Sequence, residues 1–427
     1  MFSGVSGLRS HQTMMDVVGN NIANVNTTAY KSSNVAFADT MSQLTKAAGA
    51  PQGGIGGTNP SQVGLGVRVN AIQQNFTQGS AQSTGKATDL MLNGDGMFVV
   101  NRAEGSFYTR AGNFTLDQEG RLVTPDGSYV QGWRPNADGV IPTSGPTETL
   151  LVPADEVMPA VASTEFDMVG NLDKSGAPIG VAGGGYKIPD VTTSFDVFDG
   201  QGARTRVTVR FENTGTLTAA ATAEEAKRVS KDTWKITYSW DGGTADGGTI
   251  AFSATDGKYD TTANAVPATG VKTPVVLNGT SVLPNFGAMT GLVGNGISNI
   301  SADADGSTIG SLQSFAFGTD GTLTGTYSNG LKRDLGLVAI ATFNNYEGLE
   351  KVGGSMYAVT VNSGNPNVGV PGAAGRGSLG AGQLEMSNVD LSAEFTNLIL
   401  AQRGFQANSR IISTSDDILQ ELVNLKR

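Results

Sequence analysis

Large apolar side chains recur at heptad spacing at both ends of this chain. Spacings of three, four and seven place side chains on one face of a helix, and a sustained seven-residue repeat winds that face around a partner helix. The pattern therefore predicts two terminal helices that come together as a coiled coil. The side chains expected at its contacts are Leu8, Met15, Val18, Ile22 and Val25 in the first segment and Leu391, Leu398, Phe405, Ile412 and Leu419 in the last.

Neither stripe is complete. His11 interrupts the first stripe, and Gly404 weakens the last helix by roughly 1 kcal/mol relative to alanine. Two readings stay open: the helices pack on the chain's own core, which is the commoner fate of one amphipathic helix, or further helices complete the seams. The second heptad position of the last segment is mostly small or polar, with Glu394, Ala401, Asn408, Ser415 and Leu422.

The composition excludes several classes of function. The chain has 427 residues, enough for two or three domains, and 59 glycines, close to twice the frequency of roughly 7% in average proteins. Its formal charge is −10 and no basic stretch is long enough to follow a phosphate backbone, so no nucleic acid partner is expected. The absence of cysteine excludes disulfides and thiolate catalysis.

We expect neither membrane insertion nor an ordinary secretory signal. The longest apolar runs, such as 337–341, fall far short of the roughly 20 residues that span a bilayer. The first residues, MFSGVSGLRSHQ, lack a basic region followed by an apolar region and a cleavage site.

The sequence offers no pattern for catalysis, for a cofactor or for a metal ion. His11 is the only histidine, so neither a hydrolytic triad nor a histidine-rich metal site is expected. Asp303 and Asp305 belong to a D-x-D-G-S fragment that lacks the later calcium ligands and reads as a turn. Gly64-Leu65-Gly66 and Gly94-Asp95-Gly96 are partial phosphate-loop patterns and also read as turns.

The middle of the chain reads as all-β. Short β-like runs separated by turn formers fill residues 97–133, and only residues 219–230 suggest a short helix. Residues 1 to about 28 read as helix, and the Gly- and Pro-rich residues 47–66 read as loop or linker. The expected fold is mainly β with terminal helices. Further β-like runs lie within residues 194–211, 234–254 and 314–343.

The order of these parts predicts nested domains that bring both termini to one end. An inner β domain is expected to be discontinuous, with an outer β domain of residues 151–307 inserted into it. The inner domain would comprise residues 71–150 and 308–371. The remaining parts would be a helical coiled-coil domain of residues 1–30 and 388–427 and a linker of residues 31–70 and 372–387.

Two motifs at opposite ends of the chain form a matched pair. The first is Ser6-Gly7-Leu8 followed by VVGNNIANVNT at residues 17–27 and Tyr30-Lys31-Ser32. The second is SNVDL at residues 387–391 followed by AQRGFQAN at residues 401–408. In this order they resemble the paired signature of the bacterial flagellar axial proteins, the family of rod, hook and hook-associated subunits.

Internal segments resemble the same family. Residues 63–67 and 98–133 are similar to the inner β domain of hook and rod subunits, and residues 327–330 and 337–349 are similar to its returning half. A distal rod subunit has little between these halves, whereas residues 151–307 intervene here, as the outer domain of a hook subunit does.

The resemblance implies a structural subunit and no enzyme. Terminal helices of many copies would form the inner tube of a helical polymer, with the two stripes at the polymer interface. That polymer would be a flexible universal joint that passes torque from motor to filament. The alternatives are a distal rod or hook-associated protein and, from another class, a secreted all-β binding module.

The resemblance also implies where the protein acts and with which partners. Its place would be the hook, on the basal body and outside the cell, after export without a cleaved signal. The implied partners are further copies of the chain, the distal rod protein, the hook-cap protein, the hook-associated junction protein and the flagellar type III export apparatus.

Overall fold

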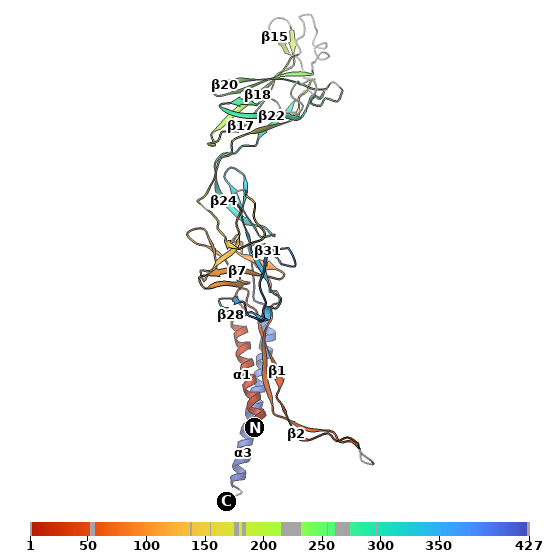
Figure 1. Ribbon diagram of the computed structural model, residues 1–427, viewed down its shortest axis with the longest axis vertical. Helices are drawn as coiled ribbons and strands as arrows, with labels where there is room; N and C mark the ends of the chain where they lie inside the picture. The colour runs from red at the N-terminus through yellow and green to blue at the C-terminus, as the bar shows by residue number, and fades with distance from the viewer. Residues whose placement is uncertain are drawn as a thin grey trace. The chain divides into compact units, whose positions relative to one another are not determined.

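The structure is a computed structural model, shown in Figure 1. Helices α1 (Phe2–Ala23) and α3 (Leu391–Asn424) lie at the two ends of the chain, and strands fill most of the sequence between them. The predicted fold class, mainly β with terminal helices, is confirmed. The short helix expected at residues 219–230 lies outside the described residues. Those residues are 2–51, 56–136, 139–153, 155–174, 179–181, 185–214, 232–253, 255–260, 274–294 and 297–424.

Helix α1 ends earlier than the sequence suggested. We expected helix to about residue 28, but α1 stops at Ala23. The Asn24 side chain donates its Nδ2 hydrogen to the Asn20 carbonyl at 2.9 Å, and so satisfies a backbone acceptor near the helix end. Asparagine competes in this way with the helical hydrogen-bond ladder.

The chain divides into two units. The first contains Met1–Ala154, Ser314–Gly325 and Lys332–Arg427, and the second contains Asp155–Gln313 and Thr326–Leu331. The sequence of the second unit is therefore inserted into that of the first.

The first unit contains both helices, most of a 14-stranded sheet and several two-stranded sheets. Its N-terminal strands are β1 (Ser33–Asp39), β2 (Ser42–Lys46), β3 (Ser61–Gly64), β4 (Val67–Gln74), β5 (Ala81–Ser83), β6 (Leu90–Asn93), β7 (Met97–Arg102), β8 (Gly105–Thr109), β9 (Thr115–Leu116), β10 (Leu122–Val123), β11 (Tyr129–Trp133) and β12 (Glu148–Thr149). Its later elements are β26 (Lys332–Val338), β27 (Ile340–Thr342), the 3-10 helix η1 (Tyr346–Gly348), β28 (Glu350–Gly353), β29 (Met356–Ala358), β30 (Asn367–Gly369), β31 (Ser378–Ala381) and β32 (Gln383–Glu385).

Strand β7 lies at the centre of the first unit's core. It pairs with β8 and β11, and its residues 97–100 are all buried, because a strand covered on both faces is apolar throughout rather than alternating. Aromatic rings pack edge to face around it: the ring centroids of Phe98 and Phe114 lie 5.1 Å apart, and those of Tyr108 and Phe343 lie 4.8 Å apart.

The second unit contains two four-stranded sheets with one shared core. The sheet orders are β17-β18-β19-β20 and β21-β22-β14-β23. Val207, Val209 and Phe211 alternate along β18 and are fully buried among side chains from both sheets, as in a sandwich. Its strands are β13 (Val157–Met158), β14 (Glu165–Asn171), β15 (Ile179–Val181), β16 (Gly185–Lys187), β17 (Val191–Phe198), β18 (Arg204–Asn213), β19 (Thr233–Trp240), β20 (Gly243–Ala251), β21 (Val275–Leu277), β22 (Thr280–Thr290) and β23 (Asn299–Ala304). Strands β24 (Gly310–Phe317) and β25 (Thr322–Tyr327) contain residues of both units.

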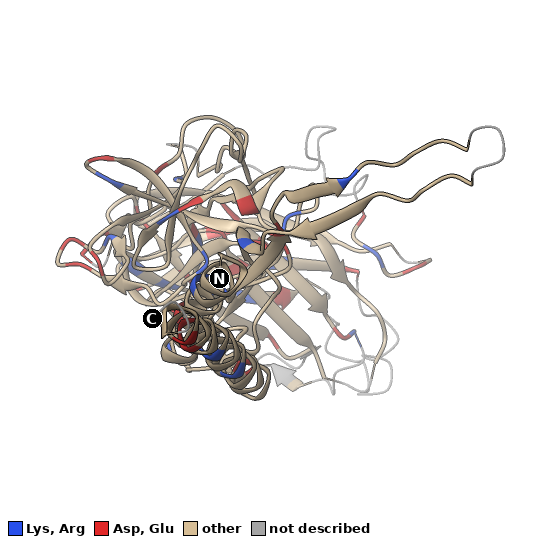
Figure 2. Ribbon diagram, turned by 90° about the horizontal axis from the view of Figure 1, so that it is seen from below, with Lys and Arg blue, Asp and Glu red and all other residues tan. Residues whose placement is uncertain are grey.

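Part of the segment that read as loop or linker is a long antiparallel hairpin. Strand β1 pairs with β4, and β2 pairs with β3. All side chains of β2 and β3 are exposed, so the alternation that marks a half-buried strand is absent from the sequence. Between residues 40 and 66 the only charged residue is Lys46, and Figure 2 shows this hairpin almost without charge.

The second segment read as linker, residues 372–387, is also partly β. Strand β31 pairs with β6, and β32 pairs with β5. Leu379 and Glu385 on these strands are buried, so this segment contributes to the first unit's interior. Partner strands about 300 residues away in sequence leave no local signal of such pairing.

Replacing Phe211 by alanine should destabilise the second unit by about 3–5 kcal/mol, because a fully buried aromatic ring leaves a cavity. Urea unfolding followed by circular dichroism measures the loss. Val169→Ala in β14 is the control, since this side chain is 45% exposed and should cost well under 1.5 kcal/mol. Equal losses in the two variants would show that the core is not where the structure puts it.

Candidate functional site

The two terminal helices pair side by side in antiparallel orientation (Figure 1). Near the start of α1, a Cβ added at Gly4 would lie 3.5 Å from Ile411 Cγ2. Near its end, Asn21 donates its Nδ2 hydrogen to Glu394 Oε1 at 2.9 Å. The extreme ends of the sequence are thus joined within one chain.

Glycines let these helices approach closely. A Cβ at Gly7 would lie 2.8 Å from the Asn408 side chain, and a Cβ at Gly404 would lie 2.5 Å from the His11 ring. The His11 ring fills the space over Gly404 and also packs on Phe37, with ring centroids 5.9 Å apart. The two residues that seemed to weaken the stripes therefore complement each other across the helix pair.

The predicted interface residues lie mostly at the margin of this contact. Val18 is buried, whereas Leu391 and Leu419 are 39% and 46% exposed. The most deeply buried position of α3 is Ala401, from the small and polar row. The other predicted side chains are half-buried: Leu8, Met15, Ile22, Val25, Leu398, Phe405 and Ile412.

Helix α3 also exposes apolar side chains that the heptad analysis did not include. Each is at least half exposed on a helix whose neighbour in the chain does not cover it. Spacings of seven and four between some of them, as from residue 411 to 418 to 422, were the available signal. The side chains are Phe395, Ile399, Leu400, Ile411, Ile418 and Val423, and Leu422 of the second heptad row is exposed as well.

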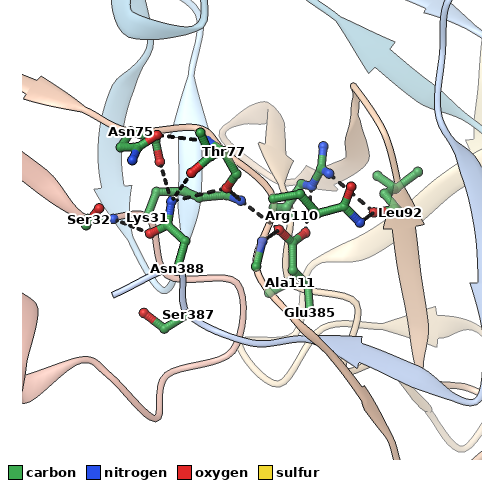
Figure 3. Close-up of polar contacts among 12 residues, drawn as sticks. Lys31, Ser32, Asn75, Thr77, Leu92, Arg110, Ala111, Glu385, Ser387 and Asn388 are labelled. Carbon is green, nitrogen blue, oxygen red and sulfur yellow. Dashed lines mark hydrogen bonds and ion pairs between the residues drawn. The ribbon is translucent and has the colours of Figure 1, made fainter. Parts of the chain in front are cut away.

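A buried ion-pair network ties the ends of both helices to the neighbouring β strands (Figure 3). Glu385 Oε1 accepts a hydrogen bond from Lys31 Nζ at 2.7 Å, and its Oε2 accepts one from Arg110 Nε at 2.7 Å. The Gly79 amide donates to the same carboxylate at 2.9 Å, and Arg110 Nη1 donates to the Gly96 carbonyl at 2.7 Å. We call Lys31, Arg110 and Glu385 the terminal ion-pair network.

Asn388 joins the residues before α3 to both ends of the hairpin, just before β1 and just after β4 (Figure 3). Its Oδ1 accepts from the Ser32 amide at 2.8 Å. Its Nδ2 donates to the Asn75 carbonyl at 2.7 Å and to the Thr77 carbonyl at 3.1 Å. One amide side chain therefore fixes three backbone positions, and the chain enters α3 in a defined direction.

Asn21 makes the corresponding connection from α1. Its Oδ1 accepts from the Ser33 amide at 3.0 Å, and its Nδ2 donates to the Ser33 carbonyl at 2.8 Å as well as to Glu394. Burial raises the pKa of Glu394, and the neighbouring Asp390 charge raises it further. Asn21 and Lys31 lie in the motifs quoted for the family, but their spacing gave no indication of these contacts.

The charge on Glu385 is held by its partners. Burial alone would raise its pKa, but the Arg110 charge, the Lys31 hydrogen bond and the Gly79 amide outweigh burial and keep the pKa below its usual range. The carboxylate therefore stays ionised, and its single negative charge is shared between the two cations beside it.

The geometry offers structural connections rather than reactive groups. Within the described ranges, no group of three or more His, Asp or Glu side chains is arranged to hold a metal ion. Asp305 Oδ1 accepts from the backbone amides of Thr164 and Glu165 at 2.8 and 3.0 Å, so this carboxylate joins two segments that are far apart in sequence. Asp303, which we expected in a turn, lies in strand β23. Neither helix in the described part of the chain is long and apolar enough to cross a membrane.

Glu385→Gln should lower the free energy of unfolding at pH 7 by about 3–5 kcal/mol, because it leaves two buried cations without their counter-charge. The pH dependence should change too. The folded-state pKa of Glu385 lies below its unfolded value of 4.5, so its contribution is present above that pH and is lost as the pH falls through the folded value. Urea unfolding at pH 7 and pH 3 tests both statements.

The exposed Glu350→Gln serves as the matched control for this prediction. It removes the same charge from a surface strand and should change stability by about 0.5 kcal/mol or less. A Glu385→Gln protein as stable as this control would contradict a structural role for the network.

Three family descriptions match successive parts of the chain. "Flagella basal body rod protein" matches residues 1–31, "Flagellar hook protein FlgE/F/G D1 domain" matches residues 91–197, and "Flagellar basal body rod FlgEFG protein C-terminal" matches residues 381–425. The two terminal matches contain the paired motifs and both helices.

Relatives and a solved structure extend this likeness to the whole chain. A flagellar hook protein FlgE of Treponema pallidum is 36% identical, and one of Borreliella burgdorferi is 37% identical; each alignment covers 100% of this chain and 99% of the relative. A flagellar basal-body rod protein FlgG of Bacillus subtilis is 31% identical, over 100% of this chain and 98% of its own length. The crystal structure of Helicobacter pylori flagellar hook protein FlgE2 has a similar fold, with a TM-score of 0.51 and 15% identity over 70% of this chain and 98% of that one. The chain therefore belongs to the flagellar hook protein FlgE family.

Proposed function

We propose that this chain is the structural subunit of a flagellar hook, which self-assembles into a helical tubular polymer. The polymer acts as a universal joint that transmits motor torque from rod to filament during motility. The observation that carries the proposal is the incomplete helix pair: α1 and α3 pack together and leave a long apolar surface of α3 uncovered. Full-length similarity to proteins named as hook subunits supports it.

The polymer interface consists of the two predicted stripes together with the exposed side chains of α3. Covering one large apolar side chain stabilises an assembly by about 1.5–3 kcal/mol. Within the two stripes, Leu391 and Leu419 are the most exposed in the single chain and so gain most from a neighbour. Half-buried positions such as Leu398 and Phe405 serve both the pair within the chain and contacts between copies.

Torque passes from the helices to the β units through the terminal ion-pair network. Both connections, from α1 into β1 and from β32 into α3, lie beside Glu385 and Asn388. Buried charges that pair with one another resist displacement, because separating them would leave more uncompensated charge in the interior.

The inserted unit is the outer domain of a nested arrangement. We assign residues 151–307 to this outer β domain and residues 71–150 and 308–371 to the inner one. The second unit of the structure, which begins at Asp155 and contains its own sandwich core, supports this division.

The further partners and the location follow from the family. They are the distal rod protein, the hook-cap protein, the hook-associated junction protein and the type III export apparatus, at the hook outside the cell. A narrow export channel admits only an unfolded chain. A chain without cysteine forms no disulfide that would hinder this passage.

The rival reading, a secreted binding module, loses its main support in this structure. Exposed aromatic clusters would favour it, but Trp133 and Trp234 are buried and Trp240 packs against the second unit's core. A distal rod subunit remains the nearest alternative within the family, because the FlgG relative also matches the whole chain. Tubes that bend under load favour a joint, and stiff straight tubes favour a rod.

Ile412→Asp should abolish tube formation. Ile412 is half-buried beside Gly4, so aspartate there places a charge in an apolar seam at a cost of several kcal/mol in every subunit. Electron microscopy of the purified protein detects the tubes, and circular dichroism checks that the β units stay folded. The exposed Asp417→Asn is the control and should assemble normally. Normal tubes from Ile412→Asp would refute the proposed interface.

A further inference from the structure

A groove runs along the first turns of α1 in the first unit. Helix α1 forms one wall, strand β4 and the residues before it form the other, and the volume is about 710 Å³. Phe2, Val5, Leu65 and Val67 line it and are all exposed, with Phe2 85% accessible. The single chain leaves this apolar surface open.

The end of α3 is the matching segment. Gly4 lies opposite Ile411 and Ile412, so residues 413–424 of α3 run past the start of α1, as Figure 1 shows at the C-terminal end of the helix. We call residues 413–424 the tail. Its apolar side chains are all at least 46% exposed: Ile418, Leu419, Leu422 and Val423.

The tail continues the same helix face that α1 already covers. Leu419 follows the buried Ala401 by 18 residues, which is about five helical turns, so the two side chains point in the same direction. Leu422 lies three residues further on and is adjacent on that face. The tail is therefore an extension of an existing helix–helix contact surface that lacks its partner helix.

We propose that the tail of one copy docks in the groove of a neighbouring copy. This inference rests on the proposed function and assigns two surfaces to one of its subunit contacts. The lengths agree: the groove follows α1 from Phe2 to Thr13, about 17 Å, and the twelve residues of the tail span about 18 Å.

The charges of the two surfaces are complementary. Arg9 and Arg68 line the groove, and among the described residues no acidic side chain does. The tail carries Asp416, Asp417 and Glu421 and, within its described residues, no Lys or Arg. Asp416 precedes Val423 by seven residues, and Glu421 follows Ile418 by three, so these two acids stand at the edges of the apolar strip. Such rim charges orient the docking helix more than they strengthen it.

A tail cannot occupy the groove of its own chain. It leads away from the start of α1 as part of one continuous helix, and turning back along α1 would break α3. In each contact the tail therefore belongs to one copy and the groove to another. A contact between two different surfaces builds an open helical chain rather than a closed dimer.

Engineered cysteines test the contact, because the chain has none of its own. The full-length double variant Val5→Cys/Leu422→Cys is assembled, treated with a short bis-maleimide reagent, denatured and separated by gel electrophoresis. We expect a ladder of covalent dimers, trimers and longer chains. A mixture of the two single variants should stop at dimers, since each copy then has only one reactive surface.

The control pair is Val5→Cys/Asp417→Cys, because Asp417 points away from the apolar strip and should give no ladder. Val67→Cys with Leu422→Cys tests the opposite wall, in case one groove substitution impairs assembly. Tubes seen by electron microscopy that give no ladder with either pair, or a link within single chains, would overturn the docking and leave the proposed function standing. If the unsubstituted chain forms no tubes, the proposed function itself fails and this contact with it.

Discussion

The carboxylate of Glu385, held between Lys31 and Arg110, is the interaction on which the rest of the structure depends. It joins three segments that are far apart in sequence: the exit from α1, the end of β8 and the approach to α3. Burial of charges is costly, and only mutual pairing with further hydrogen bonds makes it tolerable. The network is therefore satisfied only when both chain ends and the inner strands occupy their places together.

The pairing of α1 with α3 follows from that arrangement. Once Asn21 and Asn388 hold the two connections beside each other, the helices leave in adjacent positions and Gly7 and Gly404 allow them to touch. Close packing through glycine uses the small side chains and leaves many of the large ones outside. Isolated helices of this kind are marginal in water, so a second layer of helices from other copies would complete their burial.

Local sequence patterns predicted most helices and strands, whereas the site is formed by contacts between residues that are far apart in sequence. The strands between residues 97 and 133 and the two terminal helices were predictable, because apolar periodicity is a property of neighbouring residues. The hairpin of β1 and β4 was missed since its side chains bury little. The role of Glu385 was missed as well, because its cations are Lys31 and Arg110, and their distance in sequence conceals the contact. The sequence showed only that Gly404 lowers helix stability. It did not show that the His11 ring occupies the space that the missing side chain leaves.

The unequal lengths of the terminal helices explain why one chain does not complete its own interface. Helix α3 has 34 residues and α1 has 22, so an antiparallel pair joined at the network must leave part of α3 without a partner. Two helices of equal length would cover each other to their ends and give a self-contained monomer. Here the surplus end has an exposed strip of apolar side chains, and the groove beside α1 is lined by exposed apolar side chains as well. A chain with one uncovered tail and one open groove can cover both only by contacting two other copies, and repeating these contacts builds a polymer.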